Sequence, residues 1–432
     1  MNQAGTIWAL ASGSGAAGVA VIRVSGPQAR ACVEALAGRV PAPRRAAVRT
    51  LRAADKSAID QGLVLWFPGP ASFTGEDCAE FQVHGGPAIV TAVGEALSCI
   101  PGVRLAEPGA FTRRAFENGK LDLTQAEAIA DLVAAETESQ RKQALRQLEG
   151  ELGALYGRWR EALVTALAWL DAEIDFPDEA LPGGLAARAY ETLEPLARDM
   201  AAHLEDGRVG ERVREGFRVA ILGEVNAGKS SLLNALAGTD AAIVSDLPGT
   251  TRDVVEVRLV LGGHVVWVAD TAGLRDTSDA IETEGIRRAL ARAEAADLVI
   301  RAVPAGAEPH AVRPGELLVR TKADLAVAAA SDSRDGLWVS AVTGSGLDEL
   351  KAVITARAAA GASEAAPLTR RRHRVGVEQA LAEVRRAVSS IGTPELAAES
   401  VRAAGDALGR IVGRIGVEEV LDRVFAEFCI GK

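Results

Sequence analysis

The sequence predicts a multidomain protein: an N-terminal α+β domain, a helical domain, and an α/β domain inserted into the helical one. Three observations support this prediction. Short apolar runs alternate with Gly- and Pro-rich turns up to about residue 118. A helical period follows, and it returns near the end of the chain. Between these helical stretches, strands alternate with helices in the pattern of an α/β fold. The expected boundaries are 1–118, 119–215 with 356–432, and 216–355.

The composition suits a chain with several hydrophobic cores and no metal or disulfide framework. Of 432 residues, 48% are hydrophobic, enough for two or three domains. The four cysteines lack CxxC spacing and the five histidines are scattered. No long apolar run or targeting segment is evident, so we expect a cytoplasmic protein without a membrane segment. The net charge of −10 argues against nonspecific coating of nucleic acid.

The first domain contains three stretches that predict strands. They are "GVAVIRVSG" (18–26), "QGLVLWFPGP" (61–70) and "AEFQVHGG" (79–86). Each ends at Gly or Pro, as strands that lead into turns do.

The helical domain begins with an apolar stripe at spacings of three and four. This stripe predicts one amphipathic helix through Leu145, Leu148, Leu152, Leu155 and Trp159. The segment "DFPDEALPGG" (175–184) interrupts the helical region. The second helical stretch opens with "TRRRHR" (369–374), which is either a solvated helix start, the usual role of such a charge run, or a local basic face.

The inserted domain carries a phosphate-binding motif. "GEVNAGKS" (223–230) fits GxxxxGKS, follows the apolar strand "FRVAILG" (217–223) and precedes a helical run. Its amides and the helix N-terminus suit phosphates, Lys229 neutralises them, and the Ser230 hydroxyl is a ligand for Mg²⁺. A hairpin is expected within residues 253–270, turning at Gly262–Gly263.

Four later motifs complete a GTP site. "PGTTRD" (248–253) offers hydroxyls for Mg²⁺, and "DTAG" (270–273) places a carboxylate near Mg²⁺ and a Gly near the γ-phosphate. In "TKAD" (321–324), Asp324 can accept two N–H bonds from guanine, and "SAVTG" (340–344) closes the base pocket. The motifs predict GTP rather than ATP as the ligand.

Two positions depart from the usual GTPase pattern. Thr321 stands where the guanine motif NKxD has Asn. Its side chain has a hydroxyl but is shorter than that of Asn, so we expect the site to bind guanine more weakly. Leu274 occupies the position where many switches have a water-orienting Gln. Glu282 is a candidate for that role, although spacing alone equally permits a solvated helix carboxylate.

Several blocks resemble the MnmE (TrmE) family of tRNA-modifying GTPases over the whole chain. They include "VIRVSG", "FTGED", "PGAFTRRAFENGKLDLTQAEAIADLV", "VNAGKSSLLNALAG", "IVSDLPGTTRD", "DTAGLRDTSDAIETEGI" and the terminal "FCIGK". The resemblance implies that the N-terminal domain dimerises and binds a tetrahydrofolate one-carbon derivative. The implied folate-binding residues are Arg23, Glu80, Lys120 and Lys432.

The resemblance also implies K⁺-dependent hydrolysis by G domains that pair face to face. The K⁺ ligands would be Asn226, Ser245, Leu247 and Thr250; Ser230 and Thr251 would bind Mg²⁺, and Glu282 would position water. The predicted GTP-binding residues are Asn226, Ala227, Gly228, Lys229, Ser230, Ser231, Ser245, Asp246, Leu247, Pro248, Gly249, Thr250, Thr251, Asp270, Thr271, Ala272, Gly273, Lys322, Asp324, Ser340 and Ala341.

The family acts with an FAD-dependent partner, MnmG (GidA), on C5 of the wobble uridine of certain tRNAs. The product carries an aminomethyl or carboxymethylaminomethyl group. Cys429 is either a nucleophile at C6 of the pyrimidine or a buried cysteine at a helix end.

Two other functions compete with tRNA modification. A ribosome-assembly GTPase of the Era or EngA type would need a KH-like RNA module or a second G domain. Only one P-loop is present, and "GRIG" (413–416), which imitates a KH clamp, is not followed by a strand pattern. A purely regulatory switch leaves the first 215 residues without a purpose.

Overall fold

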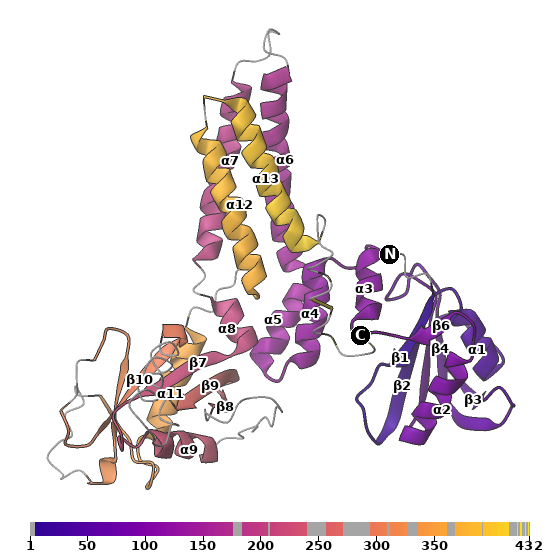
Figure 1. Ribbon diagram of the computed structural model, residues 1–432, viewed down its shortest axis with the longest axis horizontal. Coiled ribbons are helices and arrows are strands. Elements are labelled where there is room, and N and C mark those ends of the chain that lie inside the picture. Colours follow the sequence, from indigo (N-terminus) through magenta and orange to yellow (C-terminus); the bar gives the residue numbers. More distant parts are fainter. Residues whose placement is uncertain are drawn as a thin grey trace, which may run out of the picture. The chain divides into compact units, whose positions relative to one another are not determined.

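Figure 1 shows the helices and strands of the computed structural model. By its internal contacts the chain divides into two compact units. The first comprises residues 1–130, 147–160 and 405–432, and the second comprises residues 131–146 and 161–404. The residues described are 5–175, 184–205, 208–239, 256–270, 294–308, 312–325, 336–360, 368–390, 392–413, 421, 424, 425, 428 and 431. Among the helices of these segments, none is both long and apolar enough to cross a membrane. The three domain boundaries expected from the sequence stay predictions.

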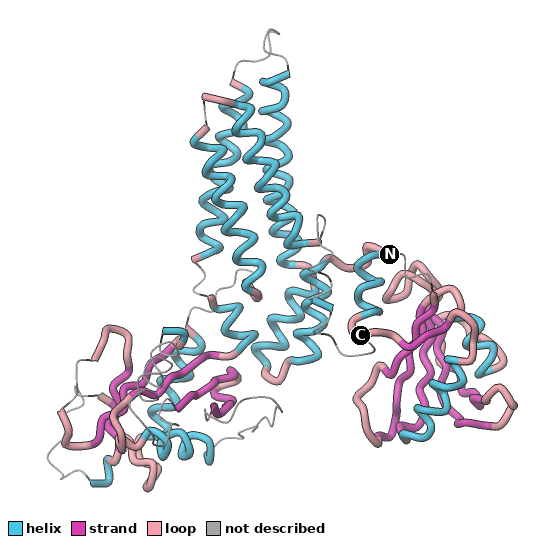
Figure 2. Tube along the Cα trace, viewed as in Figure 1, coloured by secondary structure: helices cyan, strands magenta, loops and turns pink. Residues whose placement is uncertain are grey.

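The first unit contains a six-stranded sheet in the order β3-β4-β5-β2-β1-β6. Its strands are β1 (Thr6–Leu10), β2 (Ala17–Ser25), β3 (Ala47–Arg52), β4 (Ala58–Phe67), β5 (Cys78–Gly85) and β6 (Val103–Leu105). Strands are drawn in magenta in Figure 2. The three stretches predicted as strands are β2, β4 and β5. The prediction missed β1, β3 and β6.

Helices cover both faces of this sheet near β1. Helices α1 (Ala29–Ala37) and α2 (Pro87–Ser98) pack on one face, with Trp8 and Leu10 beside them. Ile7 and Ala9 point to the other face, against Phe111 of α3 (Ala110–Glu117). This alternation follows from the two-residue period of a strand.

The end of the chain belongs to the first unit. Phe425 and Phe428 pack with Leu123 of α4 (Leu123–Ala134) in one hydrophobic cluster. Gly431 lies so close to the end of β1 that a Cβ there would come within 2.1 Å of the Leu10 carbonyl oxygen. Gly431 therefore lies directly against the N-terminal sheet.

The apolar stripe predicted as one helix is two helices. Helix α5 (Glu138–Leu148) ends before Gly150, which has a left-handed φ of 90°, and α6 (Glu151–Asp175) begins just after it. Leu152 and Trp159 are buried as expected. The single-helix prediction was wrong because the stripe keeps its spacing across a turn that Gly150 makes possible.

The helices of the second unit pack lengthwise. Helix α7 (Leu185–Leu204) packs against α12 (Arg371–Ser389), and the Tyr190 hydroxyl donates to the Ser390 carbonyl at 3.0 Å. The short α8 (Val209–Glu215) leads into the second sheet. Helix α13 (Pro394–Val412) follows α12.

The second sheet has the order β12-β11-β10-β7-β9-β8. Its strands are β7 (Phe217–Leu222), β8 (Glu256–Leu261), β9 (His264–Asp270), β10 (Leu298–Pro304), β11 (Leu317–Thr321) and β12 (Leu337–Trp338). All neighbours pair in parallel except β8 and β9, which form the hairpin predicted at Gly262–Gly263. Helices α9 (Lys229–Thr239) and α11 (Leu347–Ala359) contribute to its core.

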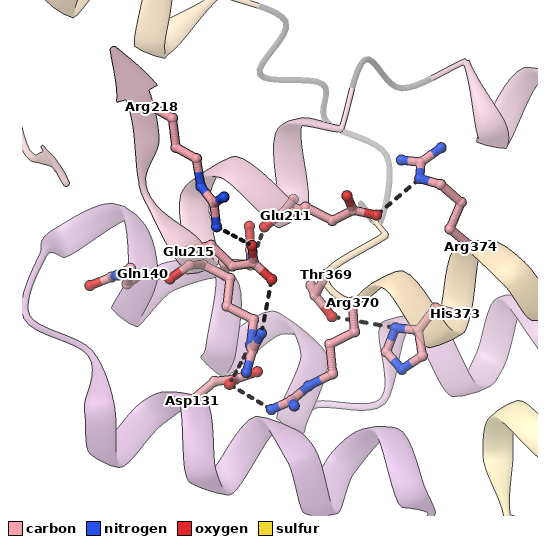
Figure 3. A network of polar contacts seen from close by, with 12 residues as sticks. Asp131, Gln140, Glu211, Glu215, Arg218, Thr369, Arg370, His373 and Arg374 are labelled. Atoms are coloured by element: carbon pink, nitrogen blue, oxygen red, sulfur yellow. Dashed lines mark hydrogen bonds and ion pairs between the residues drawn. The ribbon is translucent and has the colours of Figure 1, made fainter. Parts of the chain in front are cut away.

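The segment "TRRRHR" is mostly buried, which corrects both interpretations of it. Thr369 and His373 are almost fully buried, and Arg370 and Arg374 are each 8% exposed. These arginines bind carboxylates of the second unit (Figure 3). The pattern of charges could not reveal this, because the paired acids lie far away in sequence.

Candidate functional site

The described parts of four predicted nucleotide motifs, the P-loop, DTAG, TKAD and SAVTG, meet at one edge of the second sheet. Strands β9, β7, β10, β11 and β12 are parallel, so their carboxyl ends share that edge. The P-loop follows β7, Asp270 ends β9, Thr321 ends β11, and Ser340 follows β12. In open α/β sheets, ligands bind at this edge.

The P-loop conformation depends on two left-handed residues and one close approach. Asn226 and Gly228 have φ values of 63° and 82°. A Cβ on Gly223 would come within 2.4 Å of the Ala302 carbonyl oxygen, so only glycine fits beside β10. The loop thereby turns its backbone N–H groups into a concave site for anions.

The Lys229 side chain reaches back across the P-loop and is held there by backbone carbonyl oxygens. The side chain is buried, and Nζ donates to the carbonyl oxygens of Gly223 and Glu224, each at 2.7 Å. A buried ammonium at the N-terminus of α9 supplies positive charge where phosphates would bind. Ala227 is buried, whereas Asn226, Ser230 and Ser231 are exposed.

Thr321 joins the guanine motif to the P-loop. Its buried hydroxyl donates to the Ala227 carbonyl oxygen at 2.6 Å. The expected loss of reach therefore does not prevent contact with the phosphate-binding loop. Lys322, with a left-handed φ of 57°, follows directly, and a Cβ on Gly228 would lie 3.8 Å from its Cε.

Ser340 orients Asp324. Its hydroxyl donates to Asp324 Oδ1 and accepts from the N–H groups of Val342 and Thr343 at 3.3 and 3.2 Å. Ser340 is almost fully buried, and Ala341 beside it is half-buried. The carboxylate is thus fixed for hydrogen bonds from a base.

The other predicted nucleotide-site residues lie outside the described residues. These are Ser245, Asp246, Leu247, Pro248, Gly249, Thr250, Thr251, Thr271, Ala272, Gly273 and Glu282; for Asp270 only the backbone is described. Of the predicted metal ligands, the structure describes Ser230 for Mg²⁺ and Asn226 for K⁺. Hydroxyl and amide oxygens suit such hard cations. Within the described ranges, no group of three or more His, Cys, Asp or Glu side chains could hold a metal.

A second candidate site lies on the N-terminal sheet. Arg23 and Glu80 are opposite each other on β2 and β5, and Arg23 Nε and Nη2 donate to Glu80 Oε1 at 3.0 and 2.9 Å. Their side chains are only 21% and 17% exposed, so neither is an ordinary surface charge. The Arg23 guanidinium also lies 5.5 Å from the centre of the Phe73 ring and 5.9 Å from that of Phe111.

The loop that contains Phe73 also contacts Lys120. Lys120 Nζ donates to the Pro70 carbonyl at 3.1 Å, and a Cβ on Gly75 would lie 3.4 Å from Lys120 Cγ. This loop therefore contacts Arg23 and Lys120, and Glu80 joins them through its ion pair with Arg23. Lys432 and Cys429 lie outside the described residues, but Gly431 packs against the end of β1.

Arg114 gives this loop a buried support that its sequence motif did not predict. Arg114, 5% exposed, donates to Glu76 Oε2 at 2.8 Å and to the carbonyls of Ser25 and Gly5 at 3.2 and 2.7 Å. Its position within the quoted "PGAFTRRAF" block was the available signal. Arg114 thus ties the start of β1, the end of β2 and the loop together.

The comparisons with known proteins cover the whole chain. The family model described as "GTP-binding protein TrmE N-terminus" matches residues 6–120, and "MnmE helical domain" matches residues 123–429. The proteins named tRNA modification GTPase MnmE from Parvibaculum lavamentivorans and Phenylobacterium zucineum are 53% and 54% identical, over 99% of this chain and 100% and 99% of their own lengths.

Among solved structures, the G domain of the T. maritima FeoB iron transporter is 28% identical. It covers 33% of this chain and 98% of its own, with a TM-score of 0.26. The matches to the full-length relatives are far more extensive. The chain belongs to the MnmE family of tRNA modification GTPases.

Proposed function

We propose that this chain hydrolyses GTP and, with an FAD-dependent partner of the MnmG (GidA) type, modifies C5 of the wobble uridine of certain tRNAs. The product carries an aminomethyl or carboxymethylaminomethyl group. The observation that supports the proposal is the assembly of the P-loop, Thr321, Asp324 and Ser340 at one sheet edge in a chain of this family.

The nucleotide site has a role for each described residue. The P-loop amides and Lys229 bind the phosphates, and Asp324 accepts two N–H bonds from guanine. An adenine base offers no such pair of donors at that position. Ser340 keeps the carboxylate in place, and Thr321 keeps the base-binding loop in register with the P-loop.

Hydrolysis relies on residues assigned by family resemblance. Ser230 and Thr251 would hold Mg²⁺; Asn226, Ser245, Leu247 and Thr250 would hold K⁺. Bound there, the cations would stabilise the charge that develops on the phosphates. Glu282 would orient the attacking water in place of the missing Gln. We expect the nucleotide domains of two copies to pair.

The N-terminal site would bind the one-carbon folate. Arg23, Lys120 and Lys432 carry positive charges that suit the carboxylates of a folate tail, and Glu80 is an acceptor for the N–H edge of a pterin. Because Arg23 and Glu80 bind each other, a ligand would share this pair. Methylenetetrahydrofolate bound at these residues would supply the carbon that is transferred. Cys429 is either a nucleophile at C6 or a buried structural thiol.

The test is mass spectrometry of wobble nucleosides in tRNA from cells depleted of this chain. Loss of the C5-aminomethyl-type uridines, restored by a plasmid copy, is the expected result. A copy with Lys229→Ala should express equally and fail to restore them. Unchanged uridines in depleted cells would overturn the proposal.

A further inference from the structure

The chain segments before and after the inserted nucleotide domain both bind one acidic residue of the helical region. Asp131 near the end of α4 accepts from Arg214 Nε at 2.9 Å and from Arg370 Nη2 at 2.8 Å. Arg214 precedes the inserted sheet and Arg370 follows it, so one carboxylate binds both connecting segments (Figure 3). Asp131 and Arg370 are 16% and 9% exposed, which limits screening of this contact by solvent.

Further hydrogen bonds fix the same junction. Arg374 donates to Glu211 Oε1 and to the Leu204 carbonyl, both at 2.9 Å. The Gln140 and Gln143 side chains of α5 donate to the carbonyls of Arg214 and Gly210 at 3.2 and 3.0 Å. Hydrogen bonds therefore hold both segments that connect the second sheet to the helices, the one before β7 and the one at the start of α12.

A separate contact joins the β8–β9 hairpin to the helices. Arg258 of β8 forms an ion pair with Glu136, in the turn between α4 and α5, and is only 11% exposed. Its guanidinium lies 5.6 Å from the centre of the Trp267 ring. Trp267 is directly opposite Arg258 on β9, and its Nε1 donates to the Glu215 carbonyl at 2.9 Å.

The backbone at Gly216 makes room for this indole. Gly216 has a φ of 98°, and a Cβ there would come within 2.6 Å of Trp267 Cδ1. A side chain at this position would displace the hairpin from the connecting segment. The close approach is therefore built into the sequence at the start of β7.

The hairpin is also the part of the sheet that is joined directly to the nucleotide motifs. Strand β9 ends at Asp270, the first residue of DTAG, and β8 begins three residues after PGTTRD. A nucleotide-dependent change at either motif would act on the two strands that carry Arg258 and Trp267. Because paired strands move together, such a change would reach Glu136 as a displacement of the hairpin.

We propose that Arg258 and Glu136 form a coupling contact that transmits the nucleotide state to the α4–α5 turn, with Asp131 holding the two connections as its fixed base. Arg258, Glu136 and Asp131 are positioning residues and do not touch the nucleotide. The link from this contact to tRNA modification rests on the function proposed above, whereas transmission of the nucleotide state to the α4–α5 turn does not depend on that function.

The experiment is a charge exchange in the full-length chain. Arg258→Glu, Glu136→Arg and the double variant are compared by hydrogen exchange of residues 131–146 with GDP and with a non-hydrolysable GTP analogue. The wild type should show a nucleotide-dependent difference in exchange. Each single variant should reduce it by about fivefold or more. The double variant should restore it to within about twofold of the wild type, because the pair is re-formed with opposite polarity.

A second readout is the number of modified uridines formed per GTP hydrolysed, with the flavoprotein partner and tRNA present. Single variants should keep GTP hydrolysis and lose about fivefold or more in this ratio. Arg386→Glu is the matched control, since Arg386 is 64% exposed and pairs with Glu383 on the surface of α12. It should change neither readout.

The outcomes separate this inference from the proposed function. Wild-type exchange that is the same with both nucleotides, or single variants that behave like the wild type, would overturn the coupling contact. A double variant no better than the singles would also contradict it. A wild-type chain that shows the exchange difference but modifies no uridine would leave the contact standing and refute the proposed function.

Discussion

The nucleotide site and the N-terminal site are built in opposite ways. The first is assembled from short motifs, and parallel strands bring those that the structure describes to one edge. The second depends on strand register, because Arg23 and Glu80 are 57 residues apart and meet only where β2 and β5 pair antiparallel. A shift of one residue in the β2–β5 register would turn the Arg23 side chain to the other face of the sheet. Local motifs therefore identify the first site, whereas pairing creates the second.

The largest expected effect tests the motif-built site. Asp324→Asn should weaken GTP binding by about 100-fold or more, because two hydrogen bonds to a carboxylate are lost. Binding of a xanthine nucleotide should improve, since the Asn amide offers a donor to the oxygen that replaces guanine's amino group. Calorimetry with both nucleotides measures this exchange. Equal loss for both would show that the variant disturbs the pocket as a whole.

Cation exchange tests whether the exposed Asn226 serves hydrolysis. Replacing K⁺ by Na⁺ at constant ionic strength should reduce GTP hydrolysis by about tenfold or more, because the smaller Na⁺ would not fill a site sized for K⁺ and the positive charge at the phosphates would be lost. The initial rate of phosphate release is the measurement. Asn226→Ala should be slow in both salts. Equal wild-type rates in the two salts would rule out Asn226 as a K⁺ ligand.

Arg23→Gln tests whether the register-built site acts apart from the nucleotide site. Modification of tRNA should fall by about tenfold, because a charged hydrogen-bond donor is lost. GTP hydrolysis should stay unchanged. Arg30→Gln is the matched control, since Arg30 is 64% exposed and pairs with Glu34 on the surface of α1. A parallel fall of both activities in Arg23→Gln would contradict independent sites.

Thr321 tests how closely the two halves of the nucleotide site depend on each other. Thr321→Val keeps the shape but leaves the Ala227 carbonyl without this donor, so the KM for GTP should rise about fivefold. Thr321→Ser keeps the hydroxyl and should behave like the wild type. Steady-state kinetics of the two variants gives the comparison. Identical KM values for Val and Ser would show that the hydroxyl is unimportant.

The smallest effect concerns the core of the N-terminal sheet. Burial raises the pKa of the Cys32 thiol from 9.0 to about 11. The folded chain therefore keeps a proton that the unfolded chain loses above about pH 9, and the free energy of unfolding should fall as the pH rises from 9 toward about 11. Urea titrations across this window should show a shallower fall in Cys32→Ala. The same slope in both proteins would contradict the prediction.

The sequence alone determined the features that depend on local backbone chemistry. The Gly-rich loop after an apolar strand predicted the P-loop, and Gly262–Gly263 predicted the hairpin, because both need conformations that few other residues adopt. The three-part fold class followed from changes of hydrophobic period. The TKAD and SAVTG motifs predicted that Asp324 and Ser340 belong to one base pocket, and the structure adds the hydrogen bond between them.

Only the tertiary structure decided which residues far apart in the sequence contact each other. Charge runs such as residues 369–374 are usually solvated, and burial of Arg370 and Arg374 depends on Asp131 and Glu211, which lie far away along the chain. The reach of Thr321 to the P-loop and the opposition of Arg23 and Glu80 likewise depend on which strands are neighbours. Sequence spacing specifies local backbone geometry, whereas the partner of a buried charge is fixed only when distant segments pack and exclude water.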